Sequence, residues 1–204
     1  SKNGVWYDND SRYKYYNHGP LARTELGDIN VQGTDYAYTL QGWIKGTNSN
    51  TLQSDRDMGK DGFIGGTRQF TARDVMGFTL TYYQGDYQDI KGYAPLQRFE
   101  ALASGSDFMN ARSDLWNGNV GGMVTALPDM ANYGSLRTIT PNVRAGAYRY
   151  DQMNRLIEAR SFFNINIAGN QWNVGTPLPV DYYENFAYDA IGNIKHVNRW
   201  GNGG

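Results

Sequence analysis

The chain has 204 residues, which is enough for one domain with its own hydrophobic core. Its 19 basic and 20 acidic side chains leave a formal net charge of -1, so it has no field that would collect nucleic acid or anionic lipid. It has no cysteine, which excludes disulfides and thiolate chemistry, and no apolar run of about 18 residues that could span a bilayer.

The apolar content is unusually aromatic, with 16 Tyr, 8 Phe and 5 Trp beside 25 Gly and only 6 Pro. Aromatic side chains favour half-buried pleated surfaces, and glycines favour tight turns. The composition therefore predicts an all-β fold.

The first element along the chain is a nine-residue pattern at 13–21, repeated at 36–44. It reads aromatic, any residue, Tyr, three residues, Gly or Asn, any residue, and Leu or Ile. The Tyr, turn and return positions are Tyr15, Gly19 and Leu21 in the first copy and Tyr38, Gly42 and Ile44 in the second.

A polar segment, 48–66, follows and is rich in Asn, Ser, Asp and Gly, which predicts a long loop with weak order. Its residues Asp55, Asp57, Asp61 and Gly62 partly match a calcium-binding loop. Counted from Asp57, however, Gly and Arg stand at positions three and twelve, where such a loop needs an oxygen ligand and a Glu. A polar loop without metal is the favoured interpretation.

Strand-like runs continue through the middle of the chain, at 70–72, 78–83 and 120–125, each bounded by turn residues. Residues 117–119, Asn-Gly-Asn, predict a tight turn before the last run. A short helix is expected at 95–103, with Pro in its first turn.

Two more copies of the nine-residue pattern occur at 148–156 and 186–194. This composition gives roughly one twentieth of a match by chance, so four copies indicate a repeated unit. The equivalent residues are Tyr150, Asn154 and Leu156 in the third copy and Tyr188, Gly192 and Ile194 in the fourth; Asp151 and Asp189 follow the tyrosines.

Each copy predicts one β-hairpin. Side chains alternate along a strand, so the two aromatics share one face, and the Leu or Ile that starts the return strand covers the same core. The Gly or Asn position needs positive φ, and an Asp three residues before it is typical of a type I turn. Because a single hairpin cannot bury such a face, the hairpins are expected to stack as antiparallel strands of one curved sheet.

The third and fourth copies resemble the YD repeat of the RHS family, whose signature is Tyr-Asp, two residues, Gly, any residue and Leu. The segments 15–45 and 115–120 are similar to a divergent form found in large exported bacterial proteins. Three departures stand out: Tyr16 and Thr39 occupy the Asp position, and Asn154 occupies the Gly position.

The resemblance implies a structural module, part of a hollow β-shell that encloses or displays a toxin or effector domain. It divides the chain into hairpin repeats at 1–46, a divergent β-rich insertion at 47–147, and hairpin repeats at 148–204 with an open C-terminal end. The implied partners are neighbouring repeats of a longer polypeptide, an enclosed polymorphic toxin and a secretion machine such as type IX. The implied location is secreted or cell surface, and no cofactor is implied.

Two other functions stay open. A carbohydrate-binding or adhesin surface could use Trp43, Trp116, Trp172 and Trp200, although core packing is the favoured role for them. A glycoside hydrolase needs two facing carboxylates, and is the least favoured function. The remaining candidates for catalysis or ligation are two histidines and four glutamates. His18 and His196 are interpreted as structural or solvent-exposed. The glutamates are interpreted as solvated surface or strand-edge carboxylates, namely Glu25, Glu100, Glu158 and Glu184.

Overall fold

The computed structural model describes residues 10–88, 99, 107–129, 141–163, 165–166, 171–172 and 180–201. The main strands are β1 (Ser11–Tyr15), β2 (Leu21–Leu26), β3 (Gln32–Tyr38), β4 (Ile44–Thr47), β5 (Gly77–Thr81), β6 (Gly122–Pro128), β7 (Pro141–Tyr150), β8 (Leu156–Phe162), β11 (Val180–Tyr188) and β12 (Ile194–Gly201). The other elements are β9 (Ile165–Asn166), β10 (Gln171–Trp172) and one helix, α1 (Asp107–Ala111). The predicted all-β class is confirmed.

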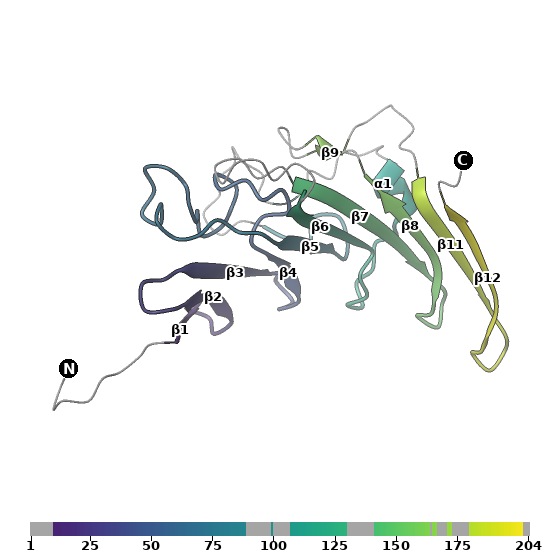
Figure 1. Cartoon of the computed structure of the whole chain (residues 1–204). Coiled ribbons are helices and arrows are strands. Elements are labelled where there is room, and N and C mark those ends of the chain that lie inside the picture. The colour runs from purple at the N-terminus through teal and green to yellow at the C-terminus, as the bar shows by residue number, and fades with distance from the viewer. Residues whose placement is uncertain are drawn as a thin grey trace.

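The main strands form one open antiparallel sheet of ten strands, in the order β1-β2-β3-β4-β5-β6-β7-β8-β11-β12. Figure 1 shows them side by side in a single layer, from β1 at the purple end to β12 at the yellow end. β9 and β10 pair only with each other. Strands that follow one another in the chain are thus neighbours in space, which is the order that stacked hairpins produce.

The hydrophobic core lies where α1 packs on the second half of the sheet. Phe108 of α1 is fully buried and meets Phe162 of β8 edge to face, with ring centroids 5.9 Å apart. Small residues of β6 and β7 surround this contact, namely Ala126, Ala145 and Ala147. Gly122 makes the close approach possible, because a Cβ there would come within 2.8 Å of the Phe108 ring.

The polar segment 48–66 contains no helix or strand, but the expectation of weak order was wrong for its first part. Ser49, Asn50 and Thr51 are completely buried. Gly77 of β5 passes so close to Ser49 that a Cβ would overlap the Ser49 backbone. Tertiary packing therefore fixes a segment whose composition is typical of a solvated loop.

Two further expectations differ from the structure, and a third falls almost entirely on residues outside those described. The run at 70–72 is not a strand, since Phe70 is 93% exposed and only Ala72 forms an isolated bridge, to Gln32. The predicted strands at 78–83 and 120–125 exist, but with shifted bounds, as β5 and β6. The expected helix at 95–103 lies outside the described residues apart from Phe99, and α1 was not predicted.

Every hairpin was expected to cover its aromatic face by packing against its neighbours. The structure shows this only for the inner strands of the sheet. Tyr38, Tyr150 and Tyr188 are half-buried, whereas Tyr15 on β1 is 63% exposed and Ile194 on β12 is 57% exposed. All eight residues of β12 are exposed. The physical reason is position, because β1 and β12 are the edges of the sheet and have a paired neighbour on one side only.

Candidate functional site

The four predicted hairpins share one register. The anchor tyrosine of each copy pairs with the Leu or Ile six residues later, as Tyr150 pairs with Leu156 and Tyr188 with Ile194. A register shift stands immediately before the tyrosine in every copy. The remaining two pairs are Tyr15 with Leu21 and Tyr38 with Ile44.

The turns are also the same. In the fourth copy, Asp189 N–H donates to Asn193 O at 2.9 Å, and Gly192 N–H donates to Asp189 O at 3.2 Å. The other three copies repeat both bonds at equivalent positions. All four turn residues have positive φ, as the sequence predicted: 116° at Gly19, 84° at Gly42, 61° at Asn154 and 97° at Gly192.

The aspartate after the tyrosine organises its turn. Asp151 Oδ1 accepts the backbone N–H groups of Met153 and Arg155, both at 2.9 Å, and Asp151 Oδ2 accepts Arg155 Nε at 2.6 Å. Asp189 accepts hydrogen bonds from its own turn in the same way. The bonds from Arg155 lower the pKa of Asp151, and those from the Asn193 side chain and turn backbone lower that of Asp189, because hydrogen bonds favour the charged form.

The tyrosine hydroxyls join one hairpin to the next. Tyr188 Oη donates to Leu156 O at 2.6 Å, and Tyr150 Oη donates to Val120 O at 3.1 Å. Tyr82 Oη donates to Ile44 O at 2.8 Å. Leu156 and Ile44 stand two residues after a turn residue with positive φ. In these three cases the tyrosine of one hairpin therefore binds the start of the return strand in the preceding hairpin.

Val120 extends this pattern to a fifth unit that the sequence did not reveal. It stands two residues after Gly118, whose φ is 90°. Thr81 pairs with Gly122, which is the register of Arg149 with Glu158 in the third copy. The hairpin of β5 and β6 is therefore a unit anchored by Tyr82.

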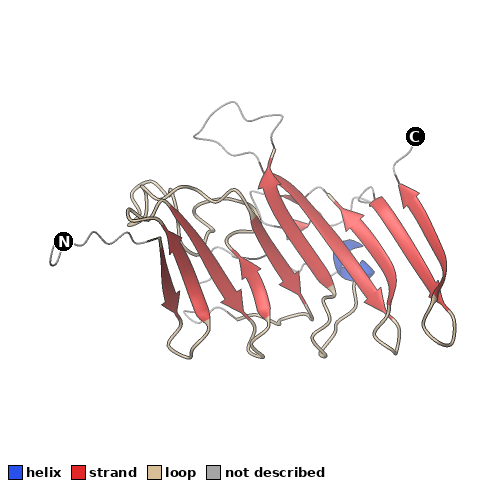
Figure 2. Cartoon of the chain, turned by 60° about the horizontal axis from the view of Figure 1, so that its bottom comes forward, coloured by secondary structure: helices blue, strands red, loops and turns tan. Residues whose placement is uncertain are grey.

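The inserted stretch between Tyr82 and Gly118 explains why the fixed spacing missed this unit. The signal that remained in the sequence was a Gly followed two residues later by an apolar residue, directly before a strand. Figure 2 shows the tight turns of the hairpins along one edge of the sheet.

Neighbouring turns also contact each other along that edge. Asn154 Oδ1 accepts hydrogen bonds from Asn117 Nδ2 at 2.7 Å and Asn119 Nδ2 at 3.1 Å. Arg155 Nη1 donates to Asp189 O at 3.3 Å, and its guanidinium lies 4.6 Å from the centre of the Tyr188 ring. Asn154 thus replaces the usual Gly because its side chain has partners there.

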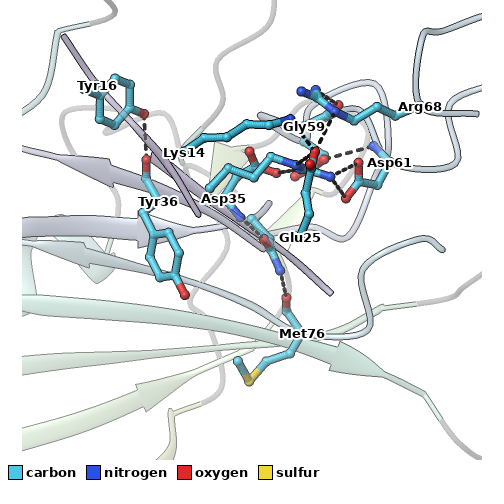
Figure 3. Close-up of polar contacts among 12 residues, drawn as sticks. Lys14, Tyr16, Glu25, Asp35, Tyr36, Gly59, Asp61, Arg68 and Met76 are labelled. Atoms are coloured by element: carbon cyan, nitrogen blue, oxygen red, sulfur yellow. Dashed lines mark hydrogen bonds and ion pairs between the residues drawn. The ribbon is translucent and has the colours of Figure 1, made fainter. Parts of the chain in front are cut away.

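A second group of functional-type side chains is a buried ionic cluster on β1 to β3. Arg23 Nε lies 2.9 Å from Glu25 Oε1, and Arg23 Nη2 lies 2.8 Å from Asp61 Oδ1. Arg23 Nη1 is paired with Asp35. Lys14 Nζ lies 2.7 Å from Glu25 Oε1. Figure 3 shows the side chains of the cluster converging from the strands and the loop, among them Lys14, Glu25, Asp35 and Asp61.

The cluster forms because of strand geometry. Arg23 and Glu25 are two residues apart on β2, so they point to the same face. Asp35 is the direct partner of Arg23 on β3. Gly33 and Gly59 leave the space for the guanidinium, since a Cβ at either would overlap Arg23 atoms. The sequence singled out Asp57 and Asp61, but their strand partners depend on register.

Burial dominates the electrostatics of this cluster. It raises the pKa of Asp35 to about 7, although Arg23 acts in the opposite direction, and it raises the pKa of Asp61. Burial and the neighbouring Asp57 raise the pKa of Asp74 to about 9. Burial also acts on Glu25, but hydrogen bonds from Lys14 and Arg23 outweigh it and lower the pKa of that carboxyl.

The candidate catalytic carboxylates do not come together among the described residues. Glu158 is paired with Arg160 at 2.6 Å, and Glu184 with Arg199 at 2.7 Å. Glu25 belongs to the ionic cluster, and Glu100 lies outside the described residues. Each of the three described candidates is thus paired with an arginine and not with another of these carboxylates.

The described histidine and tryptophan side chains contact tyrosines or solvent and not one another. His18 stacks on Tyr16, with centroids 5.4 Å apart, and His196 is on exposed β12. Trp43 packs on Tyr82. Trp172 is in β10, and its side chain lies outside the description.

The other two tryptophans are exposed and stacked on tyrosines. Trp116, 70% exposed, stacks on Tyr83 with centroids 5.6 Å apart. Trp200, 52% exposed, lies 4.8 Å from Tyr183 at the far edge of the sheet. Since β12 is several strands away from β4 and β5, Trp200 does not share a platform with Trp43 or Trp116.

Compared with known proteins, the chain matches no family model and no curated protein. Within the described residues, no helix has the length and apolar character to cross a bilayer.

Proposed function

We propose that the chain is a wall segment of an RHS-type shell, a structural module of an exported repeat protein. The observation that carries the proposal is the repeated bond between an anchor tyrosine and the preceding return strand, as in Tyr188 to Leu156 and Tyr150 to Val120. Each unit in this arrangement stabilises the next one, which is the interaction that a continuing array requires.

The two sheet edges support the same proposal. β12 is exposed throughout and presents Ile194, Val197 and Trp200 to solvent. An exposed strand edge of this kind is a template for pairing with a further strand. We therefore propose that further hairpins of a longer polypeptide pair with β12, and that others pair with β1.

The enclosed toxin or effector, the secreted or cell-surface location and the type IX route belong to the proposal through the family resemblance. A shell of this family encloses its cargo by continuing the hairpin spiral. The cargo itself would be a separate domain of the same polypeptide.

The array is testable by lengthening the chain with a second copy of residues 163–201 after Gly201. Hydrogen exchange should then slow at the amides of β12, because they acquire a paired neighbour. A matched control carries Phe in place of the anchor tyrosine of the added copy, and should show weaker protection. Unchanged exchange in β12 would contradict the proposal, and so would a flat, non-closing sheet seen by electron microscopy after several added copies.

A carbohydrate-binding surface is a second candidate, favoured by the exposed stack of Trp116 on Tyr83. Gln41 Nε2 donates to Tyr83 Oη at 2.6 Å and holds that ring in place. Aromatic faces of this kind stack on sugar rings. Glycan-array binding that disappears in Trp116→Ala, with the melting temperature unchanged and Trp200→Ala as the control, would support this function over the shell.

A further inference from the structure

Three buried aspartates meet on one side of the ionic cluster. Asp35 of β3 and Asp57 and Asp61 of the loop each place a carboxylate oxygen within 4.8 Å of the other two. Asp61 is also tied to Asp57, whose Oδ2 accepts the Asp61 N–H at 3.1 Å. The strand and the loop therefore bring three oxygen donors to one point away from water.

Asp57 and Asp74 each have one buried carboxylate oxygen without a donor among the described residues. Asp57 Oδ1 and Asp74 Oδ1 are inaccessible to solvent and accept no hydrogen bond in the part of the chain that the structure describes. Asp57 and Asp74 are only 2% and 5% exposed, and their carboxyl groups interact directly with each other. Buried carboxylate oxygens without a partner are costly, so a missing positive group is indicated.

The ion pairs of this region do not reach all of its buried carboxylates. The buried carboxylates are five, namely Glu25, Asp35, Asp57, Asp61 and Asp74. Lys14, Arg23 and Arg68 form ion pairs with Glu25, Asp35 and Asp61. Within the described residues no ion pair reaches Asp57 or Asp74, so these two carboxylates are where a bound cation would act.

The donors decide which cation fits. Carboxylate oxygens without His or Cys select a hard ion, Ca²⁺ or Mg²⁺. Mg²⁺ requires a regular octahedron and keeps most of its waters, whereas Ca²⁺ accepts irregular sets of several carboxylates. We propose that Asp57 and Asp74, together with Asp35 and Asp61, bind one Ca²⁺ between β3 and the loop that follows β4.

A bound Ca²⁺ would hold this loop on the sheet. Asn48 already connects the two, since its Oδ1 accepts Asp35 N–H and its Nδ2 donates to Met76 O, both at 2.9 Å. The ion would add a link at Asp57 and Asp74, farther along the same loop. Arg23 would keep its bonds to Asp61 and Glu25.

The test is calcium titration of the full chain after treatment with a chelator. Calorimetry at pH 7.5 should show one Ca²⁺ per chain, with weaker binding of Mg²⁺. The melting temperature should rise by roughly 5 to 10 °C when free Ca²⁺ is about a hundred times its dissociation constant. No heat and no change in melting temperature at 10 mM CaCl₂ would overturn the proposal.

The variants Asp57→Asn and Asp74→Asn separate calcium binding from folding. Each keeps the shape of the side chain and removes one negative charge, so without Ca²⁺ both should melt at or above the temperature of the parent chain. Both should lose the calcium response. Asp55→Asn is the matched control in the same loop, because Asp55 is outside the cluster, and it should keep the full response.

The outcome pattern distinguishes the rival arrangement, in which Asp57 and Asp74 share a proton in place of a cation. In that case Asp74→Asn is stabilising and the parent chain shows no calcium response. A response that persists in both Asn variants would place the ion elsewhere and would also overturn the assignment.

Discussion

The two ends of the sheet are stabilised by different interactions. At the N-terminal end, β1 to β3 are joined to the loop by buried charges around Arg23, and the loop supplies one of the three carboxylates paired with Arg23, that of Asp61. At the C-terminal end, β7 to β12 rely on the tyrosine anchors, the turns and the apolar contact of Phe108 with Phe162. The same hairpin unit can therefore be supported by a polar or an apolar face.

The difference teaches where the sheet is vulnerable. Removing one partner of a buried ion pair lowers the free energy of unfolding strongly, because the other charge stays buried without a counter-charge. A tyrosine anchor can be weakened in two stages, because its ring and its hydroxyl contribute separately to the free energy of unfolding. Three substitutions, whose expected effects decrease in order, and a change of pH test this contrast.

The largest effect is expected for Arg23→Ala. This change leaves the buried carboxylates of Glu25, Asp35 and Asp61 without their shared cation, which should lower the free energy of unfolding by about 3 to 5 kcal/mol. Urea denaturation measures it. Arg199→Ala, which breaks an exposed pair with Glu184, should cost less than about 1 kcal/mol. Equal effects of the two changes would refute a special role for the buried cluster.

Tyr150→Ala should lower the free energy of unfolding by about 3 kcal/mol, at the lower end for an aromatic truncation because the ring is half-buried. Tyr150→Phe removes only the bond to Val120 and should cost about 1 kcal/mol. Tyr15→Ala, at the exposed edge, should cost less than either. An unchanged melting temperature in Tyr150→Ala would contradict the stabilising role of this tyrosine.

Gly192→Val should cost about 1 to 2 kcal/mol, because a β-branched residue is strained at a φ of 97°. Gly192→Asn should cost less, since Asn154 occupies the equivalent position at a φ of 61°. Thermal unfolding of both variants checks the order. A larger loss for Asn than for Val would show that φ does not control this position.

Stability should also depend on pH in chelator-treated protein. The pKa values of Asp35 and Asp74, about 7 and about 9 in the folded chain, lie above the unfolded values near 4. The folded state then holds more protons between pH 4 and pH 9, so stability should fall as pH rises through this range. The lowered pKa values of Asp151 and Asp189 act oppositely and remove stability below about pH 4.

The melting temperature should thus be higher at pH 5.5 than at pH 8.5. Asp74→Asn should reduce this difference, and Asp189→Asn should leave it intact. A melting temperature that rises from pH 5.5 to pH 8.5 would contradict the assigned direction.

The turns and the strand register of the hairpins could be predicted from the sequence because they depend on residues close together in the chain. The alternation of aromatics, the Gly or Asn at positive φ and the Asp three residues earlier all act within nine residues, as in 148–156 and 186–194. The unit anchored by Tyr82 escaped because an insertion separates it from Gly118, and sequence spacing is the only information that a fixed pattern uses.

What the sequence by itself determined is the repeated hairpin, since its backbone angles and register depend on residues close together in the chain. Only the tertiary structure decided that Asp57 and Asp74 lie beside Asp35, and that 48–51 are buried, because those contacts join segments far apart in sequence. Charged side chains carry no periodic signal that predicts burial. Their partners are fixed when strand register and loop packing bring them together.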